Sequence, residues 1–101
     1  MSPQTFHILL SLADGPLHGY AIIQDVRSRT NDAIKLTAST LYDALARMVD
    51  AGLIQETERP ASAKDHDERR RYYALTPAGR RAAKDEVRRL EQTVALARER
   101  L

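Results

Sequence analysis

The stretch that decides the fold covers residues 37–54 and reads TASTLYDALARMVDAGLI. Thr37 is a good N-cap, because its hydroxyl can accept a hydrogen bond from a backbone N–H that the first helical turn leaves unpaired. Gly52 lies where a helix commonly ends in a left-handed residue. Between them, apolar residues recur at the spacing of one helix face: Leu41, Leu45, Met48 and Val49. The stretch therefore predicts an amphipathic helix of about four turns.

The polar face of this helix carries Ser39, Thr40, Asp43 and Arg47. A helix with small hydroxyls near its start and a cation one turn later can enter the major groove of DNA. There, the residues near its N-terminus reach base edges and phosphates. The same pattern also fits an ordinary amphipathic helix with a solvated outer face. The flanking segments have to decide between these two interpretations.

Two further helices are predicted before this stretch. Ser2 and Pro3 supply an N-cap and a first helical residue, and the breaker Asp14-Gly15-Pro16 ends that helix. A second helix is predicted over about 17–29. Gly19, close to its start, permits a close backbone approach, either to another helix or to a phosphate.

After Gly52 the pattern changes from helical to alternating, which predicts strands over 53–59 and 70–75. We expect one of Tyr72 and Tyr73 to point into the core and the other outward. The polar segment 60–69 has no periodicity, so the two strands form a hairpin with a long tip. Helix, turn, helix and hairpin is the order of a winged helix. Its hairpin lies along the duplex, where basic residues reach the DNA backbone or the minor groove: Lys64, Arg69 and Arg70.

Thr76-Pro77 repeats the cap-and-proline signal and predicts a last helix that runs to the end of the sequence. Its apolar residues step by four and three, which makes a heptad seam. A second copy of the chain is the simplest partner for this seam and gives a twofold homodimer. Alternatively, the seam packs on the first helix of its own chain, and both contacts can occur together. The seam residues are Ala83, Val87, Leu90, Val94, Ala97 and Leu101.

Composition narrows the class of protein. A chain of 101 residues is one domain, or one domain with an appended element, and we divide it into a winged helix-turn-helix domain over 1–76 and a dimerisation helix over 77–101. The chain has no cysteine, no apolar run of roughly 20 residues and no signal-peptide pattern, so we expect a cytoplasmic protein without disulfides or membrane spans. Residues 1–50 hold four Lys/Arg against five acids, whereas residues 59–89 hold ten against five. A basic second half suggests that one face meets a polyanion, although a solvated charged helix explains the residues beyond Arg80 equally well.

Catalytic and metal-binding patterns are missing from the sequence. The three histidines, His7, His18 and His66, fall on different predicted elements, and none begins a metal-ligand spacing. Ser39 has no Gly-x-Ser-x-Gly context, and no glycine-rich phosphate loop is present. We therefore expect neither an enzyme nor a bound metal or cofactor.

Four separated motifs cover roughly residues 6–80. In order they are Leu17-His18-Gly19-Tyr20, Ser39-Thr40-Leu41-Tyr42-x-x-Leu45, Ala51-Gly52-Leu53-Ile54 and Arg71-Tyr72-Tyr73-x-Leu75-Thr76-x-x-Gly79. Together they resemble the PadR family of transcriptional regulators. The single C-terminal helix resembles the compact subgroup of that family, in which this helix makes the dimer. The sequence departs from the family where Ser39 replaces a frequent glycine and Asp43 a frequent proline. Asp43 can accept from a cytosine amino group or stabilise the helix start through the helix dipole.

The resemblance implies a mainly α winged helix-turn-helix repressor with a small β-hairpin and a long C-terminal helix. It implies a homodimer that binds double-stranded DNA at a near-palindromic operator and that a small-molecule effector or another signal releases. It places Tyr42, Ser39 and Thr40 against the DNA, with Tyr20 close to the backbone. Some relatives hold flat aromatic ligands between tryptophans, and this chain has no Trp. The alternative is a winged-helix module that binds a partner protein without specific DNA binding.

Overall fold

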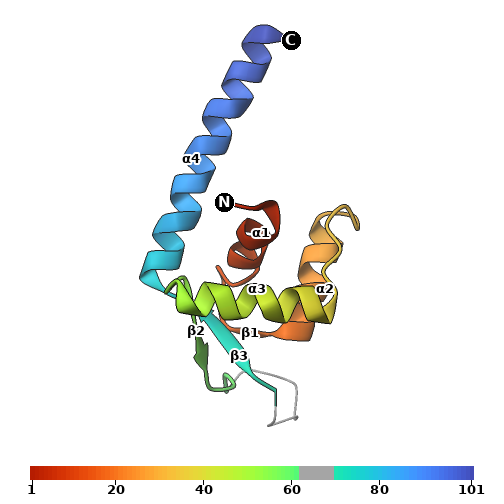
Figure 1. The fold of residues 1–101 in the computed structure, drawn as a ribbon, viewed down its shortest axis with the longest axis vertical. Helices are drawn as coiled ribbons and strands as arrows, with labels where there is room; N and C mark the ends of the chain where they lie inside the picture. The colour runs from red at the N-terminus through yellow and green to blue at the C-terminus, as the bar shows by residue number, and fades with distance from the viewer. Residues whose placement is uncertain (62–69) are drawn as a thin grey trace.

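The structure, a computed structural model, describes residues 1–61 and 70–101. Within these residues, the body holds three helices and a small antiparallel sheet, and a fourth helix projects from it (Figure 1). The C-terminal end of that helix lies at the opposite end of the molecule from α3 and the sheet (Figure 1). The predicted class, mainly α with a small β-hairpin, is confirmed, with one added strand. The elements are α1 (Pro3–Ser11), β1 (Leu17–His18), α2 (Gly19–Arg29), α3 (Ala38–Asp50), β2 (Ile54–Thr57), β3 (Tyr72–Leu75) and α4 (Pro77–Arg100).

Hydroxyl N-caps begin three of the helices at the residues that the sequence indicated. Ser2, Thr37 and Thr76 each accept a hydrogen bond from the backbone N–H three residues further on, at 3.0–3.2 Å. At the other end of α3, Gly52 has a φ of +77°, and the Leu53 N–H donates to the Met48 carbonyl at 3.0 Å. This is the geometry of a Schellman ending, which turns the chain from α3 into the wing.

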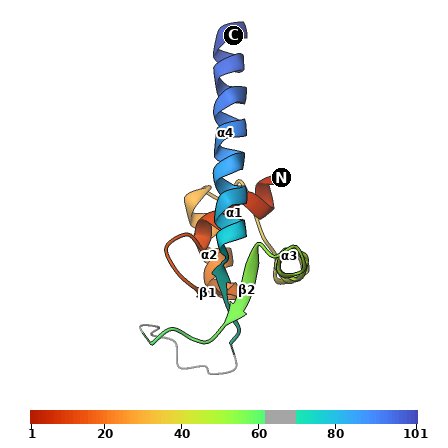
Figure 2. The ribbon, with the colours of Figure 1, turned by 90° about the vertical axis from the view of Figure 1, so that its left-hand side faces the viewer.

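The start of α2 differs from the prediction, because Leu17 and His18 form the strand β1 instead of a first helical turn. β1 pairs antiparallel with β3, with Leu17 opposite Tyr73 and His18 opposite Tyr72. The strand order is β1-β3-β2, so β3 is the central strand (Figure 2). A two-residue strand has no periodicity of its own, and only its pairing with β3 makes it extended.

Tyr72 and Tyr73 are both buried, at 4% and 5% exposed, so the prediction that one of them points outward is wrong. Tyr73 belongs to the main core cluster. The ring of Tyr72 meets the edge of the His18 ring, with centroids 5.3 Å apart and planes at 84°. Successive strand residues face opposite sides of a sheet, and here β1 supplies cover on the side that the hairpin alone would leave open.

One apolar core joins α1, α2, α3 and the sheet. The stripe predicted on α3 faces it through Leu41, Leu45 and Met48, whereas Val49 is 36% exposed. Burial of these side chains is the main force that holds the three helices and the wing together. The core cluster consists of Ile8, Leu9, Leu12, Ile22, Val26, Leu36, Leu41, Ala44, Leu45, Met48, Ile54 and Tyr73.

Candidate nucleic-acid interface

α3 lies at the end of the molecule that also carries the wing (Figure 1). Its outer face presents polar side chains. Ser39, Asp43 and Arg47 are exposed, and Tyr42 is 50% exposed. Thr40 is only partly buried, and its hydroxyl oxygen accepts from the Thr37 hydroxyl at 2.9 Å. α3 thus buries its apolar stripe and offers a polar face, as a groove-reading helix must.

The start of α2 lies beside this face. His18 is the N-cap of α2, and its Nδ1 accepts from the Ala21 N–H at 3.1 Å. Gly19 follows, buried, in contact with the side chain of Tyr42. The sequence left two partners open for the close approach at Gly19, another helix or a phosphate. The structure shows a side chain of α3 there.

Arg70, next to β3 of the wing, contacts the start of α2. Its guanidinium carbon is 5.8 Å from the centroid of the Tyr20 ring, within the range of a cation–π contact. Its Nη1 lies 3.1 Å from Nε2 of His18. Tyr20 itself is 56% exposed. These contacts place a cation and an exposed phenol side by side, a combination that can contact a phosphate backbone.

Arg71 is a second wing cation, which sequence reasoning missed. Its Nη1 lies 3.5 Å from Oε1 of Glu56 on β2, and both side chains are well exposed, so this ion pair is weak. Burial, with the nearby Glu56 carboxylate, raises the pKa of Tyr73, so its phenol is neutral. The run Arg69-Arg70-Arg71 was the available signal for a role of Arg71.

These elements together surround an open hollow of about 600 Å³. It brings together Tyr20 and Tyr42, which the family resemblance placed at the DNA, and Arg70, which the predicted wing placed there. Asp43 and Arg47 do not line it. The predicted contacts Lys64 and Arg69 lie outside the described residues. The lining consists of His18, Gly19, Tyr20, Tyr42, Arg70, Arg71 and Tyr73.

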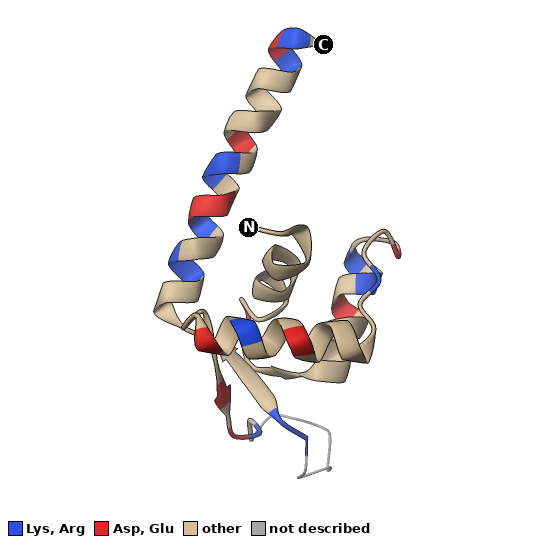
Figure 3. Ribbon diagram, viewed as in Figure 1, with Lys and Arg blue, Asp and Glu red and all other residues tan. Residues whose placement is uncertain are grey.

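The basic second half of the sequence divides between two places. Figure 3 shows Lys and Arg at the start of β3 and along α4, while α1 carries no charged residue. Several α4 cations have partners within the chain. Arg80 donates to the Ala13 carbonyl at 3.1 Å, and Arg88 pairs with Asp85. The excess of positive charge is therefore only partly a feature of the wing.

The α4 seam is covered at its beginning and uncovered further on. Ala83 packs against the core of its own chain. Val87 and Val94 are 39% and 49% exposed, and Leu101 is fully exposed. Packing on its own chain, one of the two alternatives, thus accounts for the start of the seam, and the described residues leave the later exposed positions uncovered.

Among residues 1–61 and 70–101, no group of three or more His, Cys, Asp or Glu side chains could hold a metal ion. No helix in these ranges is long and apolar enough to cross a membrane.

Comparison with known sequences connects this arrangement to a family. The family model "Transcriptional regulator PadR-like family" matches residues 8–85. Over 93 residues the chain is 35% identical to the transcriptional regulator Rv3488 of Mycobacterium tuberculosis. This match covers 92% of this chain and 78% of that protein. It is 40% identical over 73 residues to an uncharacterized 37.1 kDa protein in transposon TN4556 of Streptomyces fradiae. That match covers 72% of this chain, and the chain spans only 19% of that longer protein.

Solved structures share the fold. A transcriptional regulator from Clostridium thermocellum superposes with a TM-score of 0.78 at 28% identity, covering 95% of this chain and 87% of that one. Bacillus subtilis PadR in complex with operator DNA has a TM-score of 0.67 at 24% identity, covering 82% of this chain and 45% of that one. Because the family match spans most of the sequence and the structure has the same winged fold, the chain belongs to the PadR-like family of transcriptional regulators and is not an enzyme.

Proposed function

We propose that the protein is a sequence-specific DNA-binding repressor that acts as a homodimer on a near-palindromic operator and is released by a small-molecule effector or another signal. In this proposal residues 1–76 bind DNA, residues 77–101 make the dimer, and the protein works in the cytoplasm. One observation carries it. The exposed polar face of α3 lies beside a hollow that gathers Tyr20, Tyr42, Arg70 and Arg71.

In this proposal the α3 residues reach the major groove, and the wing arginines reach the phosphates. α3 enters the major groove, where Ser39 and Tyr42 are near its N-terminal half and Arg47 lies further along. Asp43 accepts from a cytosine amino group. Arg70 and Arg71 contact phosphates, which fix the register without reading sequence. Bacillus subtilis PadR, solved in complex with operator DNA, shares the fold over 82% of this chain, which supports DNA binding by a chain of this fold.

The uncovered part of the α4 seam supports the dimer. Val87, Leu90 and Val94 line one shallow apolar surface together with Ala95 and the flanking Glu91 and Arg98. A second copy that packs the same residues against these gives an isologous, twofold contact. Two α3 helices related by a twofold axis read two half-sites of opposite direction, which is why the operator is near-palindromic.

A binding titration tests this function. The purified protein is titrated against a duplex from immediately upstream of its own gene and against a scrambled duplex, each at two salt concentrations. A specific regulator keeps its preference for the native duplex at the higher salt. Its binding constant falls with salt, and the slope of log K against log salt concentration is about −0.9 for each neutralised phosphate.

The exposed seam also favours a second candidate, a module that binds a partner protein through α4. Such a module shows no DNA preference at either salt concentration, and its α3 face can be altered without consequence. Loss of DNA binding in the titration above would shift the assignment to this candidate.

A further inference from the structure

Gly19 and Tyr42 occupy neighbouring space at the junction of α2 and α3. A Cβ added to Gly19 would lie 2.6 Å from the Tyr42 hydroxyl oxygen, 3.0 Å from Cζ and 3.2 Å from Cε1. Gly19 is itself buried. The ring of Tyr42 therefore fills the space that any side chain at position 19 would need.

Backbone conformation does not explain the glycine at this position. Gly15 and Gly52 have φ values of +148° and +77°, whereas Gly19 has no positive φ. As the first residue of α2 it has a backbone that other residues adopt readily. The requirement for glycine at position 19 is thus steric, and the group that imposes it is the Tyr42 ring.

We propose that Gly19 is a positioning residue that acts through Tyr42. Because position 19 has no side chain, the Tyr42 ring lies against the start of α2, and this contact sets the place of its hydroxyl in the hollow that also holds Tyr20 and Arg70. The Tyr42 side chain is half exposed, and the atoms nearest to position 19 are its hydroxyl oxygen, Cζ and Cε1. The consequence for DNA binding rests on the proposed function. A ring held in one place before binding loses less conformational entropy when it contacts DNA.

A substitution of Gly19 should leave the fold intact, unlike a substitution at an ordinary packing contact. The atoms that a Cβ would meet are at the end of a side chain that can swing outward, not in the backbone. Alanine is also a better helix former than glycine. Gly19→Ala therefore moves the Tyr42 ring and leaves the fold intact, so its effect belongs to binding and not to stability.

Three variants test the proposal: Gly19→Ala, Tyr42→Phe and the double variant. Ser28→Ala, an equally small change on the exposed side of α2, is the control. The first readout is the NMR spectrum of the free protein with ring-labelled tyrosine, in which the spectrum of Tyr42→Phe identifies the Tyr42 signals. Gly19→Ala is expected to shift these signals more than those of Tyr20, Tyr72 and Tyr73, with an unchanged melting temperature. Ser28→Ala is expected to shift none of them.

The second readout is affinity for the native upstream duplex. Gly19→Ala and Tyr42→Phe are each expected to weaken binding about two- to tenfold, the range for one polar contact. The double variant is expected to match Tyr42→Phe alone, because the hydroxyl whose place Gly19 sets is then gone. Losses that multiply in the double variant, or Tyr42 signals that Gly19→Ala leaves in place, would overturn the proposal. If the wild type shows no preference for the native duplex, the proposed function fails, and the NMR readout of the free protein still decides the positioning role.

Discussion

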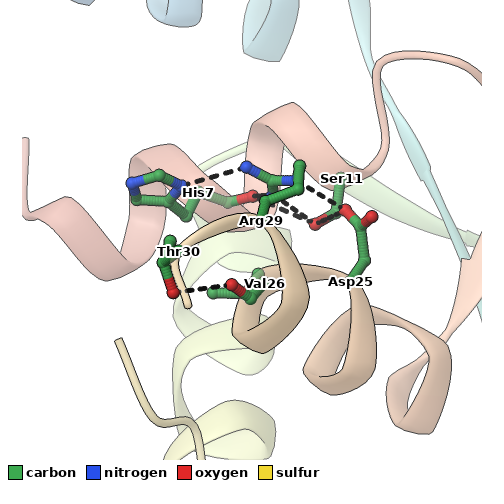
Figure 4. Close-up of polar contacts among 6 residues, drawn as sticks. All are labelled: His7, Ser11, Asp25, Val26, Arg29 and Thr30. Atoms are coloured by element: carbon green, nitrogen blue, oxygen red, sulfur yellow. Dashed lines mark hydrogen bonds and ion pairs between the residues drawn. The ribbon is translucent and has the colours of Figure 1, made fainter. Parts of the chain in front are cut away.

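Nη1 of Arg29 on α2 lies 3.1 Å from Nδ1 of His7 on α1, and this contact joins the first two helices (Figure 4). The same guanidinium donates to the Ser11 hydroxyl at 2.9 Å and, through Nε, to the Asp25 carboxylate at 2.9 Å. Ser11 in turn donates to Asp25 at 2.7 Å. Because Arg29 can only donate, His7 has to accept at Nδ1, which requires the neutral ring with its proton on Nε2.

This network predicts that acid weakens the fold through His7. Burial, and then the charge of Arg29, lower the pKa of His7 from its ordinary value of 6.5. Between that value and the lower folded pKa, the unfolded chain binds more protons than the folded one, so the free energy of unfolding rises with pH. The stability that neutral His7 contributes is fully present above about pH 6.5. It is lost as the pH falls through the pKa that His7 has in the folded protein. Urea unfolding at fixed protein concentration, at pH 7.5 and pH 5.5, measures it.

His7→Asn is the matched variant, because an asparagine oxygen can accept near the place of Nδ1 and does not titrate in this range. We expect it to reduce the loss of stability between the two pH values. Asp25 does not interfere: burial raises its pKa, but the hydrogen bonds from Ser11 and Arg29 outweigh this and leave it below 3.8. Its own contribution is lost only below about pH 4. An unchanged pH dependence in His7→Asn would show that His7 is not the responsible group.

Gly79→Ala is expected to destabilise the protein strongly. A Cβ at this position would lie 1.9 Å from the Leu53 carbonyl oxygen, and the backbone cannot move aside as a side chain can. Such overpacking costs about 1–3 kcal/mol or more, which exceeds the gain in helix propensity from alanine. Thermal unfolding should show a lower melting temperature. Gly19→Ala is the control, since its clash involves the end of a side chain and not the backbone. An equal melting temperature in the two variants would contradict this explanation of Gly79.

Val94→Glu is expected to give monomers. Val94 is half exposed in the single chain, so a carboxylate there leaves the protomer intact but places a charge in the proposed twofold contact. Burying an unpaired charge is unfavourable enough to prevent association. Light scattering or sedimentation measures the mass, and operator affinity should fall with it. Gln92→Glu, exposed on the other side of α4, should remain dimeric. A dimeric Val94→Glu would place the contact elsewhere.

Local signals in the sequence were sufficient to predict the helices, but they were insufficient to predict the contacts between elements. The caps at Thr37 and Thr76 and the left-handed Gly52 depend on residues a few positions away, so their patterns are visible in one sequence. The strand β1 and the burial of Tyr72 depend on pairing with a segment more than 50 residues away, for which no local pattern exists.

In the candidate site, too, local sequence patterns predict one part and not the other. The polar face of α3 follows from helical periodicity, and the structure leaves Ser39, Asp43 and Arg47 exposed on it as predicted. The hollow at the start of α2 could not be predicted, because it exists only where α2, α3 and β3 meet. The glycine at position 19 showed that something approaches closely, and only the structure shows that Tyr42 does.

Whether α3 reads DNA sequence is decided by comparing wild type, Arg47→Ala and Lys84→Ala on the native upstream duplex and on a scrambled duplex. Arg47 is exposed on the α3 face, and Lys84 is an exposed cation on α4 that controls for the loss of one charge. We predict that Arg47→Ala weakens binding to the native duplex about tenfold, as expected for one specific contact, and lowers the ratio of native to scrambled affinity, while Lys84→Ala leaves that ratio unchanged. A wild-type ratio of one, or an Arg47→Ala ratio equal to that of the wild type, would contradict the claim that this face of α3 reads DNA sequence.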